Sequence, residues 1–384
     1  MRPQRRARTS LLVVLAVLLL AAPASSGVEQ PLARARAALS FARSADGMQA
    51  RYDAGRALEI ALYAARRDCA QRLALARGLV RWAEGYDRLN GRLEGAGRQQ
   101  SLGTGHGCTR RYLSPVRPRL PALPPLVASA APLRPDDALD ARLDALGRAF
   151  DGYAAIWVHD LVRGTDAGWN TDARFPAAST VKLGVLLTVL QRLRHPERSA
   201  LDYDLRAMIG WSSNLATNLL VERFGAAAAQ SALRRAGAYR STFPQGYRVG
   251  TARADVQEQP PLDTARVTTA RDLGRLLYVL HACARNATVG LRATALDRER
   301  CAYGLQLLLA SELRGANVGL IRPYLPRGTR VAQKNGWLDD ARHTAAIVYA
   351  RSGPKIVVVL TYAPSLSQAR ASELGRRVVR AVWP

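Results

Sequence analysis

Three strand-like segments near the C-terminus lie so close together that they can pair in only one way. The segments "RVAQKNGW", "HTAAIVYAR" and "KIVVVLTYA" follow one another with gaps of only a few residues. A parallel pair needs a crossover of about a dozen residues or more, so these strands are expected to pair antiparallel. An earlier segment, "YAAIWVHDL", has the continuous apolar character of a buried strand and can join the same sheet.

Helical patterns surround these strands. An amphipathic helix with an acidic start is expected in "DDALDARLDALGRAF", and a second one in "SQARASELGRRVVRAVW" at the end of the chain. Further helical segments alternate with loops between about residue 179 and about residue 315. We therefore predict an α/β unit with an antiparallel sheet flanked by helices, together with an all-helical lobe.

The N-terminus has the pattern of a secretory signal peptide. Four arginines in "MRPQRRARTS" precede an apolar run from Leu11 to Ala22, and the small residues "APASSG" follow. We predict a signal peptide over residues 1–24, cleavage after Ala24, and export to the periplasm or the extracellular space. An uncleaved membrane anchor is the alternative, but a bilayer span needs about 20 residues, so we do not expect an integral membrane protein.

The rest of the chain is predicted to contain two folded units. Residues 27–113 have apolar residues at steps of three and four, which predicts a small helical N-terminal domain without recognisable chemistry. Residues 114–135 are rich in proline, which predicts a stiff, extended linker. Residues 136–384 then form the catalytic domain.

The four cysteines are Cys69, Cys108, Cys283 and Cys301. An even count in an exported protein predicts two disulfides, for which three pairings are possible. Proximity in the sequence favours Cys69–Cys108 and Cys283–Cys301, one bond in each unit. No C-x-x-C motif or histidine-rich cluster is present, so we expect neither a metal nor a cofactor.

The chain is strongly basic, with a formal charge of +26 that falls to +22 when the four arginines of the signal peptide are removed. Such a charge favours an anionic partner. Because export argues against nucleic acid, anionic polymers of the cell envelope or lipid headgroups are the expected partners of this basic surface. The alternative is a compositional bias toward arginine that indicates no partner.

Only three of the 56 basic side chains are lysines, namely Lys182, Lys334 and Lys355. Arginine stays protonated in proteins, whereas a buried lysine can lose its proton and act as a base. Lys182 lies three residues after Ser179 at the start of a predicted helix, so the two side chains share one helical face. A serine hydroxyl becomes a strong nucleophile when such a base takes its proton. The alternative is a capping serine beside a solvated lysine.

Two further short motifs follow. Ser212 and Asn214 place a hydroxyl and an amide two residues apart near the start of a helix, where an ordinary helix cap is the alternative. Lys334, Asn335 and Gly336 lie on the first strand of the C-terminal group. A glycine within a strand often marks a place where another backbone approaches closely, and an edge strand carrying a charge is the alternative here.

The order S-x-x-K, S-x-N and K-x-G resembles the active-serine β-lactamases and penicillin-binding proteins. The resemblance covers about residues 136–384, and "VTTARDLGRLL" is similar to the helix that follows the Ω-loop of this family. It implies that Ser179 is acylated, that Lys182 is its base and that Ser212 relays a proton to the departing nitrogen.

The resemblance also implies the residues that bind the substrate. Asn214 would bind the amide side chain of the substrate, and Lys334 would attract its carboxylate. The backbone N–H groups of Ser179 and Trp337 would form the oxyanion hole.

The sequence departs from the family pattern at several positions. Asn335 replaces the Thr or Ser that follows the second lysine, and its amide can still donate to the substrate carboxylate in a different geometry. Ser213 replaces an aspartate. Between Gly237 and Thr268 there is no E-x-x-L-N motif, whose glutamate positions the deacylating water in class A enzymes. The acids in the corresponding segment lack the neighbouring residues of that motif, and solvated loop acids are their simplest interpretation; they are Asp255, Glu258 and Asp263.

The sequence therefore predicts an exported serine hydrolase that forms an acyl-enzyme with β-lactams, as class A β-lactamases do, and deacylates slowly. For this family the expected consequences are β-lactam breakdown and antibiotic resistance. The first alternative is a peptidase or transpeptidase acting on D-Ala-D-Ala peptides of peptidoglycan. A second alternative is a binding protein that keeps the fold and holds envelope polymers.

Overall fold

The computed structural model describes residues 120–127, 134–199, 201–210, 212, 214–243, 266–311 and 319–384. All of them belong to a compact unit that runs from Arg119 to Pro384. The expected signal peptide, the N-terminal helical domain and the Cys69–Cys108 bond lie outside the described residues. The predicted domain boundaries therefore stay predictions.

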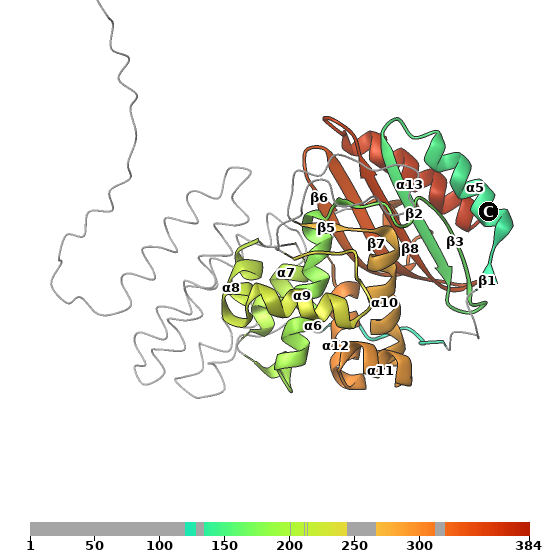
Figure 1. Ribbon diagram of the computed structural model, residues 1–384. Coiled ribbons are helices and arrows are strands. Elements are labelled where there is room, and N and C mark those ends of the chain that lie inside the picture. The colour runs from blue at the N-terminus through green and yellow to red at the C-terminus, as the bar shows by residue number, and fades with distance from the viewer. Residues whose placement is uncertain are drawn as a thin grey trace, which may run out of the picture. The chain divides into compact units, whose positions relative to one another are not determined.

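A six-stranded sheet forms the centre of this unit, with the strands in the order β1-β3-β2-β8-β7-β6 (Figure 1). Val, Ile and Ala dominate its central strands, as expected for a sheet covered on both faces. The strands are β1 (Arg134–Pro135), β2 (Tyr153–Asp160), β3 (Thr165–Trp169), β6 (Arg330–Trp337), β7 (Ala341–Ala350) and β8 (Gly353–Tyr362).

The predicted antiparallel group of three strands is confirmed. β6 pairs with β7 and β7 pairs with β8, both antiparallel, and the early strand β2 joins β8 as expected. The sheet differs from the prediction at its other edge, where the two residues of β1 pair in parallel with β3. β6 is the last strand in the order, so within the described part of the chain its outer edge has no neighbouring strand in this sheet.

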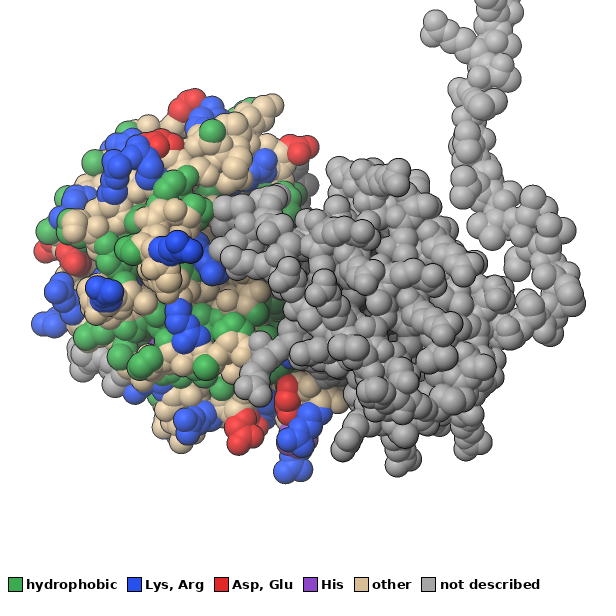
Figure 2. Space-filling view, turned by 180° about the vertical axis from the view of Figure 1, so that it is seen from behind, with side chains coloured by type: hydrophobic (Ala, Val, Ile, Leu, Met, Phe, Trp, Pro, Cys, Tyr) green, Lys and Arg blue, Asp and Glu red, His purple; other side chains and the backbone are tan. Residues whose placement is uncertain are grey.

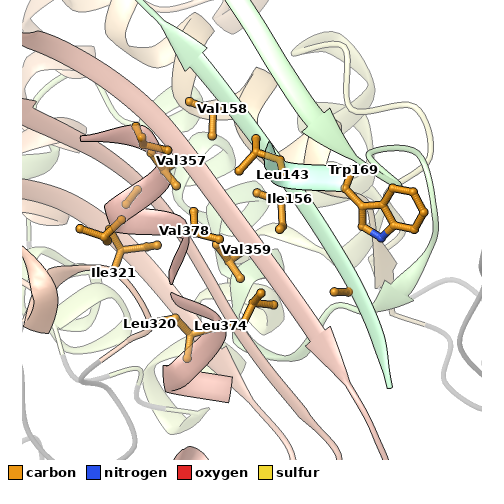
Figure 3. Close-up of a cluster of buried hydrophobic side chains, with 14 of the residues drawn as sticks. Leu143, Ile156, Val158, Trp169, Leu320, Ile321, Val357, Val359, Leu374 and Val378 are labelled. Carbon is orange, nitrogen blue, oxygen red and sulfur yellow. The ribbon is translucent and has the colours of Figure 1, made fainter. Parts of the chain in front are cut away.

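The first and last helices of the unit, α5 (Asp137–Arg148) and α13 (Gln368–Val382), cover one face of the sheet. The side chains of Ile156 and Val359 from the sheet pack there with Leu143 and Leu374 from the two helices (Figure 3). This hydrophobic cluster fixes which residues of each strand face away from the helical lobe.

Helix α10 (Ala270–Ala284) packs on the opposite face against β2, β7 and β8. It also contacts helices of the all-helical lobe, which lies beside the sheet in Figure 1. The lobe and its neighbours consist of α6 (Lys182–Arg192), α7 (Asp202–Gly210), α8 (Asn214–Phe224), α9 (Ala226–Arg235), α11 (Thr288–Thr294) and α12 (Arg298–Leu309). Among the described residues, three short 3-10 turns lie outside these helices: η2 (Ala178–Val181), η3 (Pro196–Arg198) and η5 (Arg322–Tyr324).

The described part of the proline-rich segment, residues 120–127, is in contact with this unit. Gln306 of α12 donates a hydrogen bond to the Pro121 carbonyl at 3.2 Å, and Arg330 of β6 donates to the Ala122 carbonyl. Val127 O lies 3.4 Å from Nε2 of His281 on α10. This end of the predicted linker is therefore held on the surface of the unit.

Cys283 and Cys301 form a disulfide that joins α10 to α12, as the sequence predicted. The bond ties together two helices of the region below the sheet. In the part of the chain that the structure describes, no helix is long and apolar enough to cross a bilayer.

Candidate active site

Ser179 lies in a 3-10 turn, η2 (Ala178–Val181), that runs directly into α6 at Lys182. The sequence predicted the first turn of an α-helix at this position. The turn is wound more tightly, and Ala178 just before Ser179 has a positive φ of 47°. Side chains three residues apart eclipse one another in a 3-10 turn, so Ser179 and Lys182 project toward the same side.

A short two-stranded sheet precedes this turn and holds it. β4 (Phe175–Pro176) pairs antiparallel with β5 (Val267–Thr268), and the backbone N–H of Ala177 donates to Arg266 O at 2.8 Å. The Thr180 hydroxyl donates back to Ala177 O. The turn that carries Ser179, the predicted nucleophile (the nucleophile turn), is thus fixed to a strand that immediately follows the segment in which the Ω-loop is expected.

Lys182 is buried, with 5% of its surface exposed. Its Nζ donates to the backbone carbonyl of Ser212 at 2.7 Å and lies 3.2 Å from Ser212 Oγ. Burial, followed by the positive charge of Arg266, lowers the pKa of Lys182 to about 7. A substantial fraction of this amine is therefore neutral near neutral pH and able to accept a proton.

Lys334 approaches the same hydroxyl from β6. Its Nζ lies 2.9 Å from Ser212 Oγ and donates to Asn335 O at 2.7 Å. Complete burial and the nearby charge of Lys182 hold the pKa of Lys334 well below its usual value. Ser212, whose backbone is in the left-handed region at a φ of 65°, is therefore in contact with two amines.

The backbone of β6 lies directly against the nucleophile turn. A methyl carbon added at Gly336 would lie 2.9 Å from Ser179 N and 3.0 Å from Thr180 N. Any side chain at this position would push the turn and the strand apart. The glycine of the third motif is therefore explained by a close backbone approach, as the sequence predicted.

Asn335 does not face Ser212. Alternation along β6 places its side chain on the opposite face from Lys334. There its Oδ1 accepts a hydrogen bond at 2.8 Å from the hydroxyl of Thr344, its neighbour on β7, and its side chain packs against Gly319. The Thr344 hydroxyl in turn accepts from the N–H of Leu320 at 2.8 Å. Binding of a substrate carboxylate by Asn335 remains a prediction.

The other predicted site positions are placed only by their backbone. Asn214 begins α8, and Trp337 ends β6 opposite Arg342. Their predicted roles in binding the substrate remain predictions. Asp255, Glu258 and Asp263 lie outside the described residues, as does Ser213.

The sequence analysis did not identify three residues that lie around the candidate site. They are Arg266, His343 and Thr344. Arg266 acts on the pKa of Lys182, while His343 and Thr344 lie opposite Gly336 and Asn335 on the neighbouring strand. The short hairpin between β6 and β7 is the signal that could have revealed the latter two. Once its register is known, the residues facing the K-x-G motif follow from counting.

A buried serine and two buried lysines beside a serine in a tight helical turn are the residue types that active-serine acyl-transfer proteins use to activate a nucleophile. The profile of the Beta-lactamase enzyme family (Beta-lactamase2) matches residues 138–203 and 199–384. The chain belongs to this family.

Solved structures with the same fold include PBP-A, at 20% sequence identity and a TM-score of 0.52 over 66% of this chain and 97% of that chain. A PBP-A mutant, described as an acyl-enzyme complex with penicillin G, is 20% identical with a TM-score of 0.53 over 66% of this chain and 98% of that chain. A β-lactamase from Chitinophaga pinensis is 16% identical with a TM-score of 0.51 over 64% of this chain and 98% of that chain. No match was found among curated protein sequences.

Proposed function

We propose that this protein is an exported serine hydrolase that forms an acyl-enzyme with β-lactams through Ser179. The observation that carries the proposal is the convergence of Lys182 and Lys334 on the Ser212 hydroxyl, beside the turn that presents Ser179. Membership of the β-lactamase family and the acyl-enzyme described for a protein of the same fold support it.

The first step in the proposed mechanism is proton transfer from Ser179 to Lys182. The neutral amine takes the hydroxyl proton while Ser179 Oγ attacks the carbonyl carbon of the β-lactam ring. A carbon–oxygen bond forms and the carbonyl oxygen becomes an oxyanion. The lowered pKa of Lys182 supports this role, because an amine of ordinary pKa would be almost fully protonated.

The ring then opens when the carbon–nitrogen bond breaks. The departing nitrogen needs a proton, which the Ser212 hydroxyl would donate. Ser212 would in turn be reprotonated by one of the two amines it contacts, at 3.2 Å from Lys182 or 2.9 Å from Lys334. When Lys182 supplies this proton, the net transfer is one proton from Ser179 to the nitrogen, and both lysines end as they began. When Lys334 supplies it, Lys182 keeps the Ser179 proton and Lys334 ends one proton short.

The developing oxyanion would be held by backbone N–H groups of Ser179 and Trp337. The N–H groups in the first turn of a helix have no acceptors within the helix, so Ser179 N–H is available for this purpose. The 2.9 Å distance from the position of a Gly336 methyl to Ser179 N supports this placement, because it brings the backbone of β6 close to the Ser179 N–H.

Hydrolysis is proposed to be slow at its second step, in which water attacks the acyl-enzyme. No E-x-x-L-N motif occurs between Gly237 and Thr268 to supply the glutamate that class A enzymes use. The same observation favours a second candidate function, a peptidase or transpeptidase that acts on D-Ala-D-Ala peptides of peptidoglycan. Release of D-alanine from such a peptide would distinguish this activity from β-lactam hydrolysis.

The basic surface is proposed to keep the exported protein near anionic envelope polymers. Figure 2 shows Lys and Arg side chains spread over the described part of one face, with a few acidic side chains among them. A spread of this kind suits weak, salt-dependent association.

Intact-mass spectrometry after incubation with benzylpenicillin tests the proposed acylation. We expect the mass of the protein lacking residues 1–24 to rise by the whole mass of the drug, with the label on Ser179. The Ser179→Ala variant is the control and should remain unlabelled. An unlabelled wild-type protein, or a label that persists in Ser179→Ala, would contradict the proposal.

A further inference from the structure

His343, a buried residue of β7, contacts the strand that leads into the nucleophile turn. Its Nε2 lies 2.7 Å from the carbonyl oxygen of Pro176, three residues before Ser179. Its ring also meets the Phe175 ring edge-on, with the centroids 6.1 Å apart. Both residues of β4 are therefore in contact with one imidazole.

The second ring nitrogen of His343 identifies the tautomer. Nδ1 accepts a hydrogen bond from the backbone N–H of Thr361 on β8 at 3.3 Å. Nδ1 therefore carries no proton, and Nε2–H is the donor to Pro176 O. The neutral imidazole thus bridges β8 and β4, and burial lowers its pKa to about 4, which keeps it neutral.

His343 lies directly opposite Gly336 in the pairing of β6 with β7. Residues paired in this way have side chains on the same face of the sheet. At Gly336 the missing side chain allows the backbone of the turn to approach β6, and at His343 the imidazole reaches the strand before that turn. The two residues together form the surface on which residues 175–180 rest.

The turn needs such an anchor because its local structure is weak. β4 has only two residues, and one of them is a proline, which has no N–H to donate. Ala178, between the anchor and Ser179, has a φ of 47°, in the left-handed region that is unfavourable for a residue other than glycine. Contacts outside the turn must therefore maintain it.

We propose that His343 is a positioning residue for acylation, which holds the Pro176 carbonyl and so sets Ser179 and its N–H against β6. The inference rests on the proposed acyl-enzyme function and adds to it a residue that does not touch the substrate. A displacement of about 1 Å at a reacting group can reduce a rate about 100-fold. Loss of the anchor should therefore slow the covalent step and leave non-covalent binding nearly unchanged.

The test measures acylation by a fluorescent penicillin in single turnover, which separates the covalent rate from the binding constant. His343→Leu should lower the covalent rate about 10- to 100-fold, with the binding constant changed less than threefold. His343→Gln should retain most of the rate, because a glutamine amide still carries a donor for Pro176 O. His343→Asn is one bond shorter and should behave like His343→Leu, which keeps the comparison available if the leucine variant does not fold.

His281 provides a matched control. It is buried to the same extent on α10, burial also lowers its pKa to about 4, and its Nε2 also lies near a backbone carbonyl, that of Val127. The hydrogen-bond partners of the His281 ring in the described structure are Val127 O and the Tyr349 hydroxyl, and neither belongs to residues 175–182. His281→Leu should lower the melting temperature and leave the covalent rate unchanged. Equal losses of rate in His281→Leu and His343→Leu would overturn the proposal.

Hydrogen–deuterium exchange separates this inference from the proposed function. Backbone amides of residues 175–182 should exchange faster in His343→Leu and His343→Asn than in the wild type, and remain protected in His343→Gln and His281→Leu. If the wild type does not react with penicillin, the proposed function fails while this exchange pattern still supports the positioning role. Unchanged exchange in residues 175–182 would overturn it, whatever the reactivity of Ser179.

Discussion

Lys182 and Lys334 share one hydrogen-bond partner, the Ser212 hydroxyl, at 3.2 and 2.9 Å from their Nζ atoms. Two ammonium groups at this distance from one oxygen repel each other, and burial removes the water that would screen them. The charge of Lys182 therefore lowers the pKa of Lys334 further than burial alone does, while burial and the charge of Arg266 lower the pKa of Lys182. One amine of the pair can therefore carry a proton that is ready for transfer, while the other amine is neutral and can accept a proton.

The third lysine serves as an internal comparison. Lys355 on β8 forms an ion pair with Asp160 on β2, outside the site. Burial disfavours the charged carboxylate of Asp160, but hydrogen bonds and the charge of Lys355 lower its pKa overall. An arginine can make the same ion pair, whereas no arginine can replace a neutral amine.

Lys182→Arg should therefore abolish most acylation although it keeps the positive charge. Loss of a general base costs about 10²–10⁴-fold in rate, and we expect a decrease in this range in the rate constant for labelling by penicillin. Lys355→Arg is the control and should label at the wild-type rate. Labelling of Lys182→Arg at the wild-type rate would show that Lys182 is not the base.

The acylation rate should rise with pH through the pKa of Lys182, about 7. The reactive form is the neutral amine, which is the minor form below this pKa and the major form above it. Each unit of pH below about 6 should lower the rate about tenfold, and the rate should level off above about 8. Stopped-flow labelling between pH 5 and 9 provides the measurement, and a rate independent of pH in this range would contradict the assignment.

Gly336→Ala should impair acylation because its methyl carbon would lie 2.9 Å from Ser179 N. The strand or the turn must move, so we expect a decrease of about 10- to 100-fold in the labelling rate. Gly328→Ala, in the loop before β6, is a suitable control because no atom lies within 4 Å of the added methyl group. Its positive φ of 85° predicts some loss of stability without loss of labelling. Normal labelling by a folded Gly336→Ala protein would show that the close contact is not needed.

The disulfides give a prediction about the whole chain. Peptide mapping without reduction should recover Cys283–Cys301, the bond present in the described residues, and also Cys69–Cys108. Removing Cys283–Cys301, which spans 18 residues, should lower stability by about 3 kcal/mol and leave acylation intact at low temperature. A peptide that joins Cys69 or Cys108 to Cys283 or Cys301 would disprove both the pairing and the division into two units.

Much of the fold could be predicted because the signals were local. Apolar, β-branched segments identified β2, β7 and β8, and short connections required antiparallel pairing. β3 was missed because "TDAGW" has few apolar residues, and it becomes a strand through its neighbours β1 and β2. The strand therefore depends on tertiary contacts that no local pattern reveals.

The site was predictable where spacing alone decided it. The three-residue step from Ser179 to Lys182 requires one shared face in any helical turn. The positive φ of Ala178 could not be predicted, because this turn is held by strands that are distant in the sequence. The side chain of Asn335 lies on the face opposite Lys334, where it meets Thr344, and that partner follows only from the register of β6 with β7. A motif gives the residue types, but the face on which each side chain lies is decided by packing.

The final prediction concerns turnover. Hydrolysis requires water to attack the acyl-enzyme, and this step also needs a base. The segment that would carry the class A glutamate offers only Asp255, Glu258 and Asp263, none within an E-x-x-L-N motif. Loss of a positioned base costs about 10²–10⁴-fold, so deacylation should be slower than in an efficient β-lactamase by a factor in this range.

A chromogenic cephalosporin in a stopped-flow instrument measures this directly. We expect a burst of product equal to the enzyme concentration, followed by a slow steady phase, because acylation by Ser179 is faster than release of the acyl group. Ser179→Ala should show neither phase. Fast turnover without a burst would mean that an acid in the loop replaces the glutamate. In that case the variants Asp255→Asn and Glu258→Gln would be measured separately. The acid responsible would be the one whose replacement slows turnover and produces a burst.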